Sequence, residues 1–199
     1  MTSYTDKGPK PEAGEYFGFD HATFWVGNAK QAATFYCTRF GFKHVGYRGL
    51  ETGHRSVCSH VVQNGRIFFV FCSPLTPNNS IMSQHQELHG DGVKDIAFEV
   101  DDARAVYDAA VNRGARSIRA PWIEKDEDGE VVLATVATYG DTEHTFVQRK
   151  GYNGIFLPGY RRYKYKDPLE KLLPEIPLEK IDHCVGNQPD QEMSPAVDL

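Results

Sequence analysis

The 199-residue sequence has few cysteines, no excess of positive charge and no long apolar run. Its four cysteines, Cys37, Cys58, Cys72 and Cys184, form no C-x-x-C pair, and we expect them to be reduced thiols in a cytoplasmic protein. The net charge of −5 gives no reason to expect nucleic acid or an anionic membrane as a partner. Residues 1–16 are polar, lack an apolar signal core and are expected to form a disordered tail.

The sequence also lacks a phosphate-binding loop, a dinucleotide-binding fingerprint and a nucleophile elbow. Its apolar content of 40%, with 12 Phe and 10 Tyr, is enough for an ordinary hydrophobic core. The length suits one domain, or one domain plus a fragment of another. Histidines and carboxylates therefore remain as the candidate site residues.

The first half of the chain predicts a strand, a helix and three further strands. The apolar face of the helix holds Ala29, Ala32, Ala33, Tyr36 and Phe40, at i, i+3, i+4, i+7 and i+11. Asn28 is expected to cap the start of the helix and Gly41 its end. The dipeptide Asn64-Gly65 is typical of a type I′ hairpin turn. The expected ranges are 19–26 for the first strand, 29–40 for the helix, and 42–48, 55–63 and 66–72 for the other strands.

The same order of elements restarts about 74 residues later, counted from His21 to Asp95. A connector is expected over residues 74–92. Asp101 or Asp102 caps the second helix. The expected strands are 93–100, 115–119, 131–138 and 142–148, and the helix closes at Gly114. Residues 17–150 are therefore predicted to form a domain of paired βαβββ modules in the α+β class.

Two groups of histidines in this region are candidate metal ligands. His21 and His144 could pair across the two modules with Glu143 or Asp95, which would make a complete internal site. A core or rim position is nevertheless the expected role of His21. His85 and His89 lie four residues apart in H-Q-E-L-H, but the zinc-protease pattern needs Glu where Gln86 stands. A surface loop is the expected structure there.

The last fifty residues break the rhythm of the modules. Residues 151–178 hold several prolines and the basic aromatic run R-R-Y-K-Y-K at 161–166, and they are predicted to be a solvated linker between domains that packs a tyrosine or two. Residues 179–199 predict a strand that carries His183, followed by a Gly-Asn turn and an acidic, helix-starting run. They are predicted to be the truncated, poorly anchored start of a second domain, because the partner strand and helix that would bury the apolar face cannot fit in the remaining residues.

Several segments in the right order resemble the 4-hydroxyphenylpyruvate dioxygenase family of the animal type, within the vicinal oxygen chelate superfamily. They are F-W-V-G-N-A-K-Q-A-A-T-F-Y-C (24–37), Y-R-G-L-E-T-G (47–53), H-G-D-G-V-K-D-I-A-F-E-V (89–100), Y-G-D-T (139–142), F-L-P-G-Y (156–160) and I-D-H-C-V-G-N-Q-P-D-Q-E-M (181–193). The resemblance implies two half-open, glyoxalase-like barrels, of which this sequence holds the first together with a linker and a stub of the second.

The resemblance further implies that the family converts 4-hydroxyphenylpyruvate and O₂ to homogentisate and CO₂ in tyrosine and phenylalanine catabolism. Two histidines and one glutamate of the second barrel hold Fe(II) in a facial triad. His183 matches the first of these ligands, and the other two are not in this sequence. The chain alone is therefore expected to lack turnover, and a homodimer is the expected assembly.

Two other functions stay open from the sequence. One is a non-catalytic dimerisation module, such as a splice form that pairs with the full-length enzyme. The other is a small, self-sufficient metalloenzyme of the glyoxalase or extradiol type that uses His21 and His144.

Overall fold

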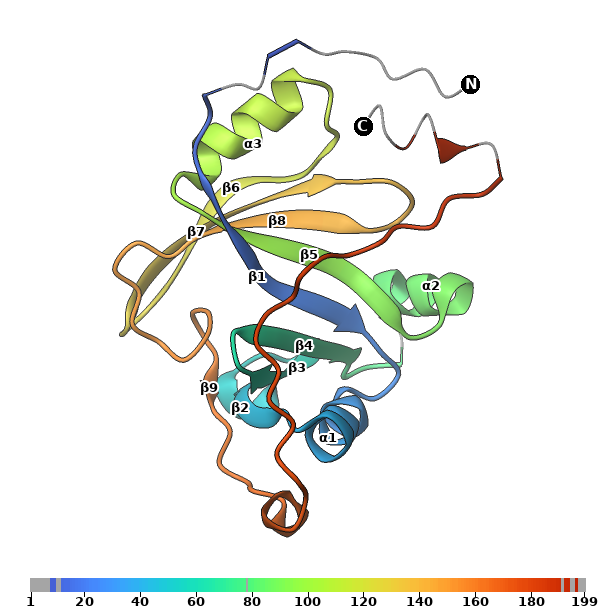
Figure 1. The fold of residues 1–199 in the computed structure, drawn as a ribbon, viewed down its shortest axis with the longest axis vertical. Helices are drawn as coiled ribbons and strands as arrows, with labels where there is room; N and C mark the ends of the chain where they lie inside the picture. The colour runs from blue at the N-terminus through green and yellow to red at the C-terminus, as the bar shows by residue number, and fades with distance from the viewer. Residues whose placement is uncertain (1–7, 10–11, 78, 191, 194–195, 197–199) are drawn as a thin grey trace.

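A single curled sheet forms the centre of the molecule (Figure 1). The computed structural model describes residues 8–9, 12–77, 79–190, 192–193 and 196. Within these residues nine strands follow the order β6-β7-β8-β5-β1-β4-β3-β2-β9. The strands are β1 Tyr16–Trp25, β2 Lys43–Arg48, β3 Val57–Asn64, β4 Ile67–Pro74, β5 Gly92–Val100, β6 Ser117–Asp126, β7 Gly129–Ala137, β8 Glu143–Gln148 and β9 Arg161–Arg162. The helices are α1 Ala29–Phe40, α2 Ser80–His89 and α3 Ala103–Asn112, with 3-10 turns η1 Leu50–Thr52 and η2 Pro168–Lys171.

The two modules close in the same way. In each module the first strand pairs in parallel with the last strand, β1 with β4 and β5 with β8. The first strands of the two modules, β1 and β5, then pair antiparallel and join the modules into one sheet. This pairing confirms the predicted βαβββ repeat, which curls into a half-open barrel with α1 and α3 on its outer side.

The local signals at the ends of α1 act as predicted. The Asn28 side chain accepts a hydrogen bond from the backbone N–H of Gln31, and Gly41 ends the helix with a φ of 70°. The buried face consists of Ala29, Ala33 and Cys37, so the expected inclusion of Phe40 in that face is wrong. Phe40 is 44% exposed.

Two expectations for the middle of the chain are wrong. The connector and the surface loop around His85 and His89 contain the helix α2, which is capped by the Asn79 side chain and buries Met82 in the core. The short strand expected over 115–119 is the ten-residue β6, an edge strand whose mixture of charged and apolar residues hides its alternation. In the described part of the chain no helix is both long enough and apolar enough to cross a membrane.

The residues after β8 complete the barrel instead of leaving it. Phe156 and Leu157 are buried in the core between the two modules, and β9 adds to the sheet beside β2. The segment 151–178 was predicted to be a solvated linker, but it supplies residues to the core. The division of the chain into domains stays a prediction. Residues 1–7 and 10–11 of the expected tail lie outside the described residues, while the Glu15 backbone N–H bonds to Asp101.

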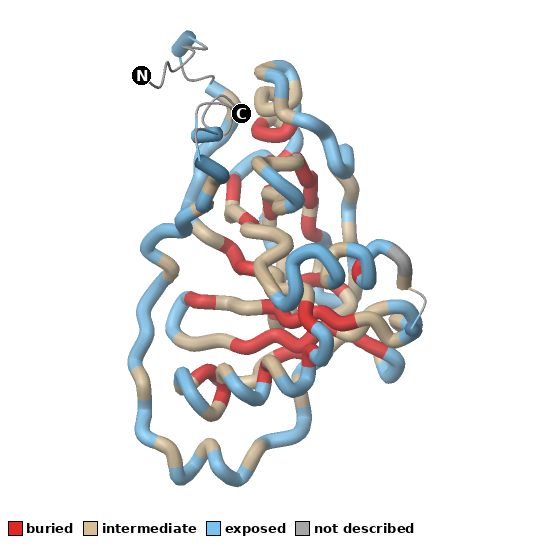
Figure 2. Tube along the Cα trace, turned by 90° about the vertical axis from the view of Figure 1, so that its right-hand side faces the viewer, coloured by how far each residue is buried: buried red, intermediate tan, exposed pale blue. Residues whose placement is uncertain are grey.

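The strand expected around His183 does not form. Residues 174–189 have no regular secondary structure, because none of the described strands pairs with them in a backbone ladder. They form a mostly exposed segment that runs along one side of the barrel (Figure 2). Ile181 still packs against the core cluster under α1.

A strap formed by residues 176–181 is fastened to the hairpin turn at Gly65. Arg66 N–H donates to Glu179 O at 2.8 Å, and the Asn64 side-chain amide donates to Ile176 O at 2.8 Å. Gly65 has a φ of 56°, and a Cβ there would lie 2.2 Å from Leu178 O. The turn can therefore hold the strap only while residue 65 has no side chain.

We expect Gly65→Ala to release the strap. Backbone hydrogen exchange over residues 176–181 should become faster, while β1 and β5 keep their protection. Gly140→Ala is the matched control, because Gly140 has a φ of 62° and nothing within 4 Å of its Cβ position. Equal exchange of the strap in both variants would contradict the role given to Gly65.

Candidate functional site

The inner face of the barrel carries a buried ionic cluster in the middle of β1. A register shift between Phe19 and His21 lets both Asp20 and His21 lie buried, against the strict alternation of a strand. Asp20 Oδ1 lies 2.5 Å from His21 Nδ1, and Arg149 donates to both carboxylate oxygens of Asp20 at 2.7 and 2.8 Å. Burial alone would raise the pKa of Asp20, but the bonds and charges of His21 and Arg149 hold it well below its usual range.

Asp95 is the second acidic group on this inner face. His21 pairs with Ala97 of β5, and Asp95 lies two residues away on the same side of that strand. Burial raises the pKa of Asp95 to about 6, although the nearby His21 and a hydrogen bond from Thr145 oppose the rise. Among the described residues Asp95 Oδ1 has no hydrogen-bond partner. The structure thus brings His21 and Asp95 near each other, as the internal-site hypothesis requires.

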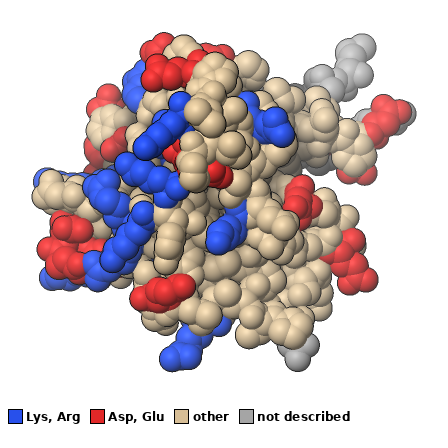
Figure 3. All heavy atoms as spheres, turned by 90° about the horizontal axis from the view of Figure 1, so that it is seen from below, with Lys and Arg blue, Asp and Glu red and all other residues tan. Residues whose placement is uncertain are grey.

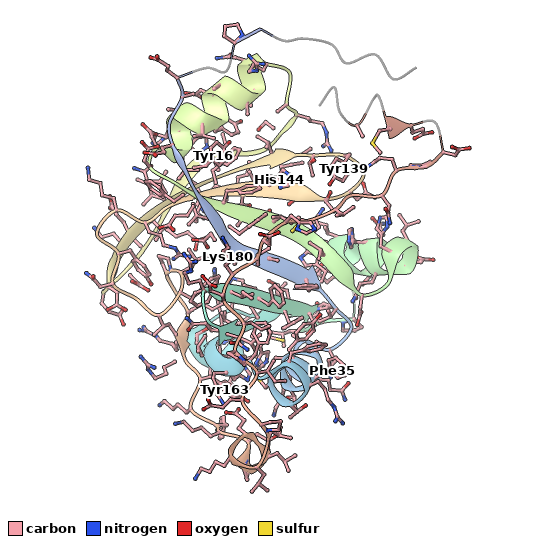
Figure 4. The ribbon with its side chains drawn as sticks, in the orientation of Figure 1. Tyr16, Phe35, Tyr139, His144, Tyr163 and Lys180 are labelled. Atoms are coloured by element: carbon pink, nitrogen blue, oxygen red, sulfur yellow. The ribbon has the colours of Figure 1, made fainter. Side chains whose placement is uncertain are left out.

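His144, the other histidine of that hypothesis, faces away from them. Thr145 pairs with Ala97 and shares its inner face, so the preceding residue, His144, points to the opposite face. His144 Nδ1 bonds to Ile96 O on the outer side, where its ring lies 5.1 Å from that of Phe98. Figure 4 labels His144 on the strand β8, close to Tyr139. The internal site with both histidines is therefore not assembled.

The chain itself fills the interior next to His21. The Phe156 ring packs edge-on against His21 with centroids 5.0 Å apart, and Arg149 also donates to Phe156 O. Asp126 ties the same segment down by accepting from Gly159 N–H and from the Tyr152 hydroxyl. The barrel interior is packed core at this point. A cavity of about 660 Å³ lies on the flank, with Asp20, Arg149 and Lys180 among its lining residues.

His183, the candidate iron ligand, lies exposed beyond the strap. Its side chain is 73% accessible, and its Nδ1 lies 2.7 Å from Asp182 Oδ2. This contact leaves Nε2 as the free ligand atom, the arrangement that carboxylates impose on metal-binding histidines. Among the residues that the structure describes, no group of three His, Cys, Asp or Glu side chains could hold a metal ion. These residues therefore do not form an iron site.

Sequence reasoning missed two polar clusters. One is the Asp20–Arg149 pair, whose members are 129 residues apart and give no local signal. The other is a pair of imidazoles beneath β9, where His60 Nδ1 lies 3.0 Å from His44 Nε2 and Tyr163 stacks on His44. Figure 4 labels Tyr163 at the end of the molecule near η2.

The basic run at 161–166 packs one of its tyrosines, Tyr163, whereas Tyr165 is 79% exposed. Arg161 pairs with Glu127 across the barrel. Seen from below, Lys and Arg side chains gather on one side with Asp and Glu among them (Figure 3). The mixture of signs differs from the uniform positive stripe of a nucleic-acid-binding surface. All four cysteines are free, as expected.

The paired modules, closed by parallel first and last strands, define a barrel protein of the vicinal oxygen chelate class. A family profile described as the Glyoxalase/Bleomycin resistance protein/Dioxygenase superfamily matches residues 18–145. The chain belongs to this superfamily, which includes the dioxygenases that the sequence resembles.

Curated relatives narrow the comparison. Proteins named 4-hydroxyphenylpyruvate dioxygenase from Xenopus tropicalis and Danio rerio are each 55% identical over 199 residues, and one from Tetrahymena thermophila is 48% identical over 204. Each alignment covers 100% of this chain and 50% of the relative. The chain thus spans about half the length of the curated relatives it matches.

Solved structures agree with the fold. A mutant of 4-hydroxymandelate synthase from Streptomyces coelicolor superposes with a TM-score of 0.66 at 26% identity, covering 81% of this chain and 45% of that one. Methylmalonyl-CoA epimerase from Mycobacterium tuberculosis superposes with a TM-score of 0.55 at 15% identity, covering 70% of this chain and 92% of the epimerase. The second likeness concerns the fold alone.

Proposed function

We propose that this chain is the N-terminal part of a 4-hydroxyphenylpyruvate dioxygenase, which converts 4-hydroxyphenylpyruvate and O₂ to homogentisate and CO₂ in the breakdown of tyrosine and phenylalanine. The observation that carries the proposal is the identity of 48–55% along the whole chain with three relatives of that name. In this proposal residues 17–150 form the first barrel, residues 151–178 complete its core and then connect it onward, and 179–199 begin a second barrel that holds Fe(II).

His183 is proposed as the first iron ligand. Two observations support this role. His183 matches the family segment at 181–193, and its Nδ1 bonds to Asp182, which leaves its Nε2 free to bind a metal. Fe(II) enzymes of this kind use a facial triad, so one imidazole is not sufficient. Because the described residues offer no second and third ligand beside His183, no step of the reaction is derived from this chain.

The role proposed for this barrel is structural. Its interior beside His21 is filled by Phe156, and the buried Asp20 is paired with Arg149 within the barrel. The proposal also includes a homodimer in the cytoplasm. Gel filtration with light scattering on the purified chain tests the assembly, and a monomer at all concentrations would contradict it.

An activity assay tests the proposed division of labour. We expect the purified 199-residue chain, supplied with Fe(II), ascorbate and 4-hydroxyphenylpyruvate, to form no homogentisate above the iron-only blank, because a single exposed imidazole cannot hold Fe(II) in an ordered site. The measurement is homogentisate by chromatography. Turnover at rates near 1 s⁻¹ or above, which is ordinary for enzymes, would overturn the proposal.

A further inference from the structure

A cavity beside β9 is lined by basic and aromatic side chains that the proposed function does not use. Its volume is about 670 Å³, within the range of about 300–1,000 Å³ in which small-molecule sites lie. Its lining residues come from α1, β2, η1, β3 and β9, and from the residues that follow β9. The cavity is therefore formed by the fold of the first module together with the segment after β8, and not by one loop.

The lining carries an excess of positive charge. Its cationic side chains are Lys30, Arg161, Arg162 and Lys164, and its one carboxylate is Glu51. The Tyr47 hydroxyl donates to Glu51 at 2.6 Å, so that carboxylate is already engaged. Arg161 pairs with Glu127, which lies outside the lining. Among the described residues, the other three cations have no carboxylate partner and are therefore available to an anion.

Aromatic rings give the cavity a second kind of surface. Tyr47, Tyr163 and Tyr165 all line it. Tyr163 stacks on His44 with ring centroids 3.5 Å apart, which fixes one ring of the lining in place. Tyr165 lies 5.8 Å from Tyr163 and is 79% exposed, so most of its ring is accessible to a planar ligand. The cavity thus offers free cations and an open aromatic ring side by side.

We propose that this cavity binds a nucleoside triphosphate. Lys30, Arg162 and Lys164 hold the phosphates, because guanidinium and ammonium groups form strong charge-assisted bonds to phosphate oxygens. The base stacks on Tyr165, as bases do on exposed aromatic side chains. A monocarboxylate would neutralise only part of this charge, whereas a triphosphate carries enough charge for all three free cations. A long nucleic acid fits less well, because acidic side chains lie among the surrounding basic ones (Figure 3).

Nucleotide binding to the purified chain tests this proposal. In a buffer of low ionic strength without divalent cations, we expect saturable binding of ATP by calorimetry with a Kd of about 1 mM or tighter. Tripolyphosphate should bind more weakly than ATP, and adenosine should not saturate in the same range, because each offers only one of the two recognised groups. No saturable binding of ATP, equal binding of tripolyphosphate, or tighter binding of a short single-stranded RNA would each overturn the proposal.

Side-chain replacements locate the site. Arg162→Ala/Lys164→Ala should weaken ATP binding by at least about tenfold, since two charged hydrogen-bond donors are lost. Tyr165→Ala should weaken ATP binding by roughly fivefold or more and leave the binding of tripolyphosphate unchanged, since only the stacking is lost. All three side chains are exposed, so the melting temperature should stay that of the unaltered chain.

The matched control removes the same charge from the second module. Arg104 and Arg116 are exposed and do not line the cavity. Arg104→Ala/Arg116→Ala should bind ATP with the affinity of the unaltered chain. Equal weakening in the two double variants would show an effect of net charge alone and would overturn the proposal. The outcome is independent of the dioxygenase assay, which measures homogentisate.

Discussion

Replacing Arg149 by Met should lower the free energy of unfolding by about 3–5 kcal/mol, the cost of leaving one partner of a buried ion pair uncompensated. The Asp20 side chain is 4% accessible and receives two hydrogen bonds from Arg149. The same guanidinium donates to Phe156 O and so holds the segment that fills the barrel. Methionine keeps most of the volume but supplies none of these bonds.

Urea denaturation measures the loss, and a thermal melt should show a drop of roughly 6–20 °C for a chain of this size. Lys150→Met is the matched control, because Lys150 is the next residue, carries the same charge and is exposed. The double variant Asp20→Asn/Arg149→Met should recover part of the stability, since it removes the stranded charge as well. A loss below 1 kcal/mol in Arg149→Met would show that His21 alone can compensate Asp20.

The parts of the fold that could be predicted are those with local causes. The helix α1 begins and ends where its cap residues Asn28 and Gly41 place it. The hairpin forms as predicted, but its two turn residues are Gly65 and Arg66, one position later than the expected Asn64-Gly65, because Asn64 still pairs with Ile67. The repeat of the modules follows from the order of such elements along the chain. Sequence alternation and capping were sufficient here because each depends on residues a few positions apart.

The parts that could not be predicted depend on distant partners or on exceptions to a pattern. Asp20 would point outward in a regular strand, and the register shift beside it lets Asp20 lie buried next to His21 and bond to Arg149. The helix α2 has little apolar periodicity, because it is mostly polar, and Met82 is the only one of its described side chains that is buried. Its histidines were therefore assigned to a loop.

His183 shows a different limit of sequence reasoning. Its residue type and the neighbouring Asp182 are compatible with a metal ligand, but the strand expected around it is absent. A strand needs a neighbour that accepts and donates backbone hydrogen bonds, and none of the described strands pairs with residues 181–187. The ligand role thus stays a prediction from the family resemblance.

The imidazole pair beneath β9 should make the folded chain sensitive to acid. Burial, then the neighbouring His60 and Lys30, lower the pKa of His44 to about 3. Burial and Lys30 likewise lower the pKa of His60 to about 4. In the unfolded chain both groups titrate near 6.5, so unfolding takes up protons below that pH. Above pH 6.5 the two histidines do not change the free energy of unfolding. As the pH falls from 6.5 toward 4, the free energy of unfolding decreases, because only the unfolded chain binds the protons.

The expected loss is about 4 kcal/mol at pH 5 for the two groups together, since each unfolded imidazole is then mostly protonated while the folded pair is neutral. Urea denaturation between pH 7.5 and 5 measures it. The variant His44→Gln/His60→Gln should flatten this part of the pH profile, whatever its stability at neutral pH, because glutamine does not titrate. His183→Gln should keep the full slope, as His183 is exposed. If the free energy of unfolding of the double variant falls just as steeply with pH, the histidine pair under Tyr163 is not the cause of the acid sensitivity.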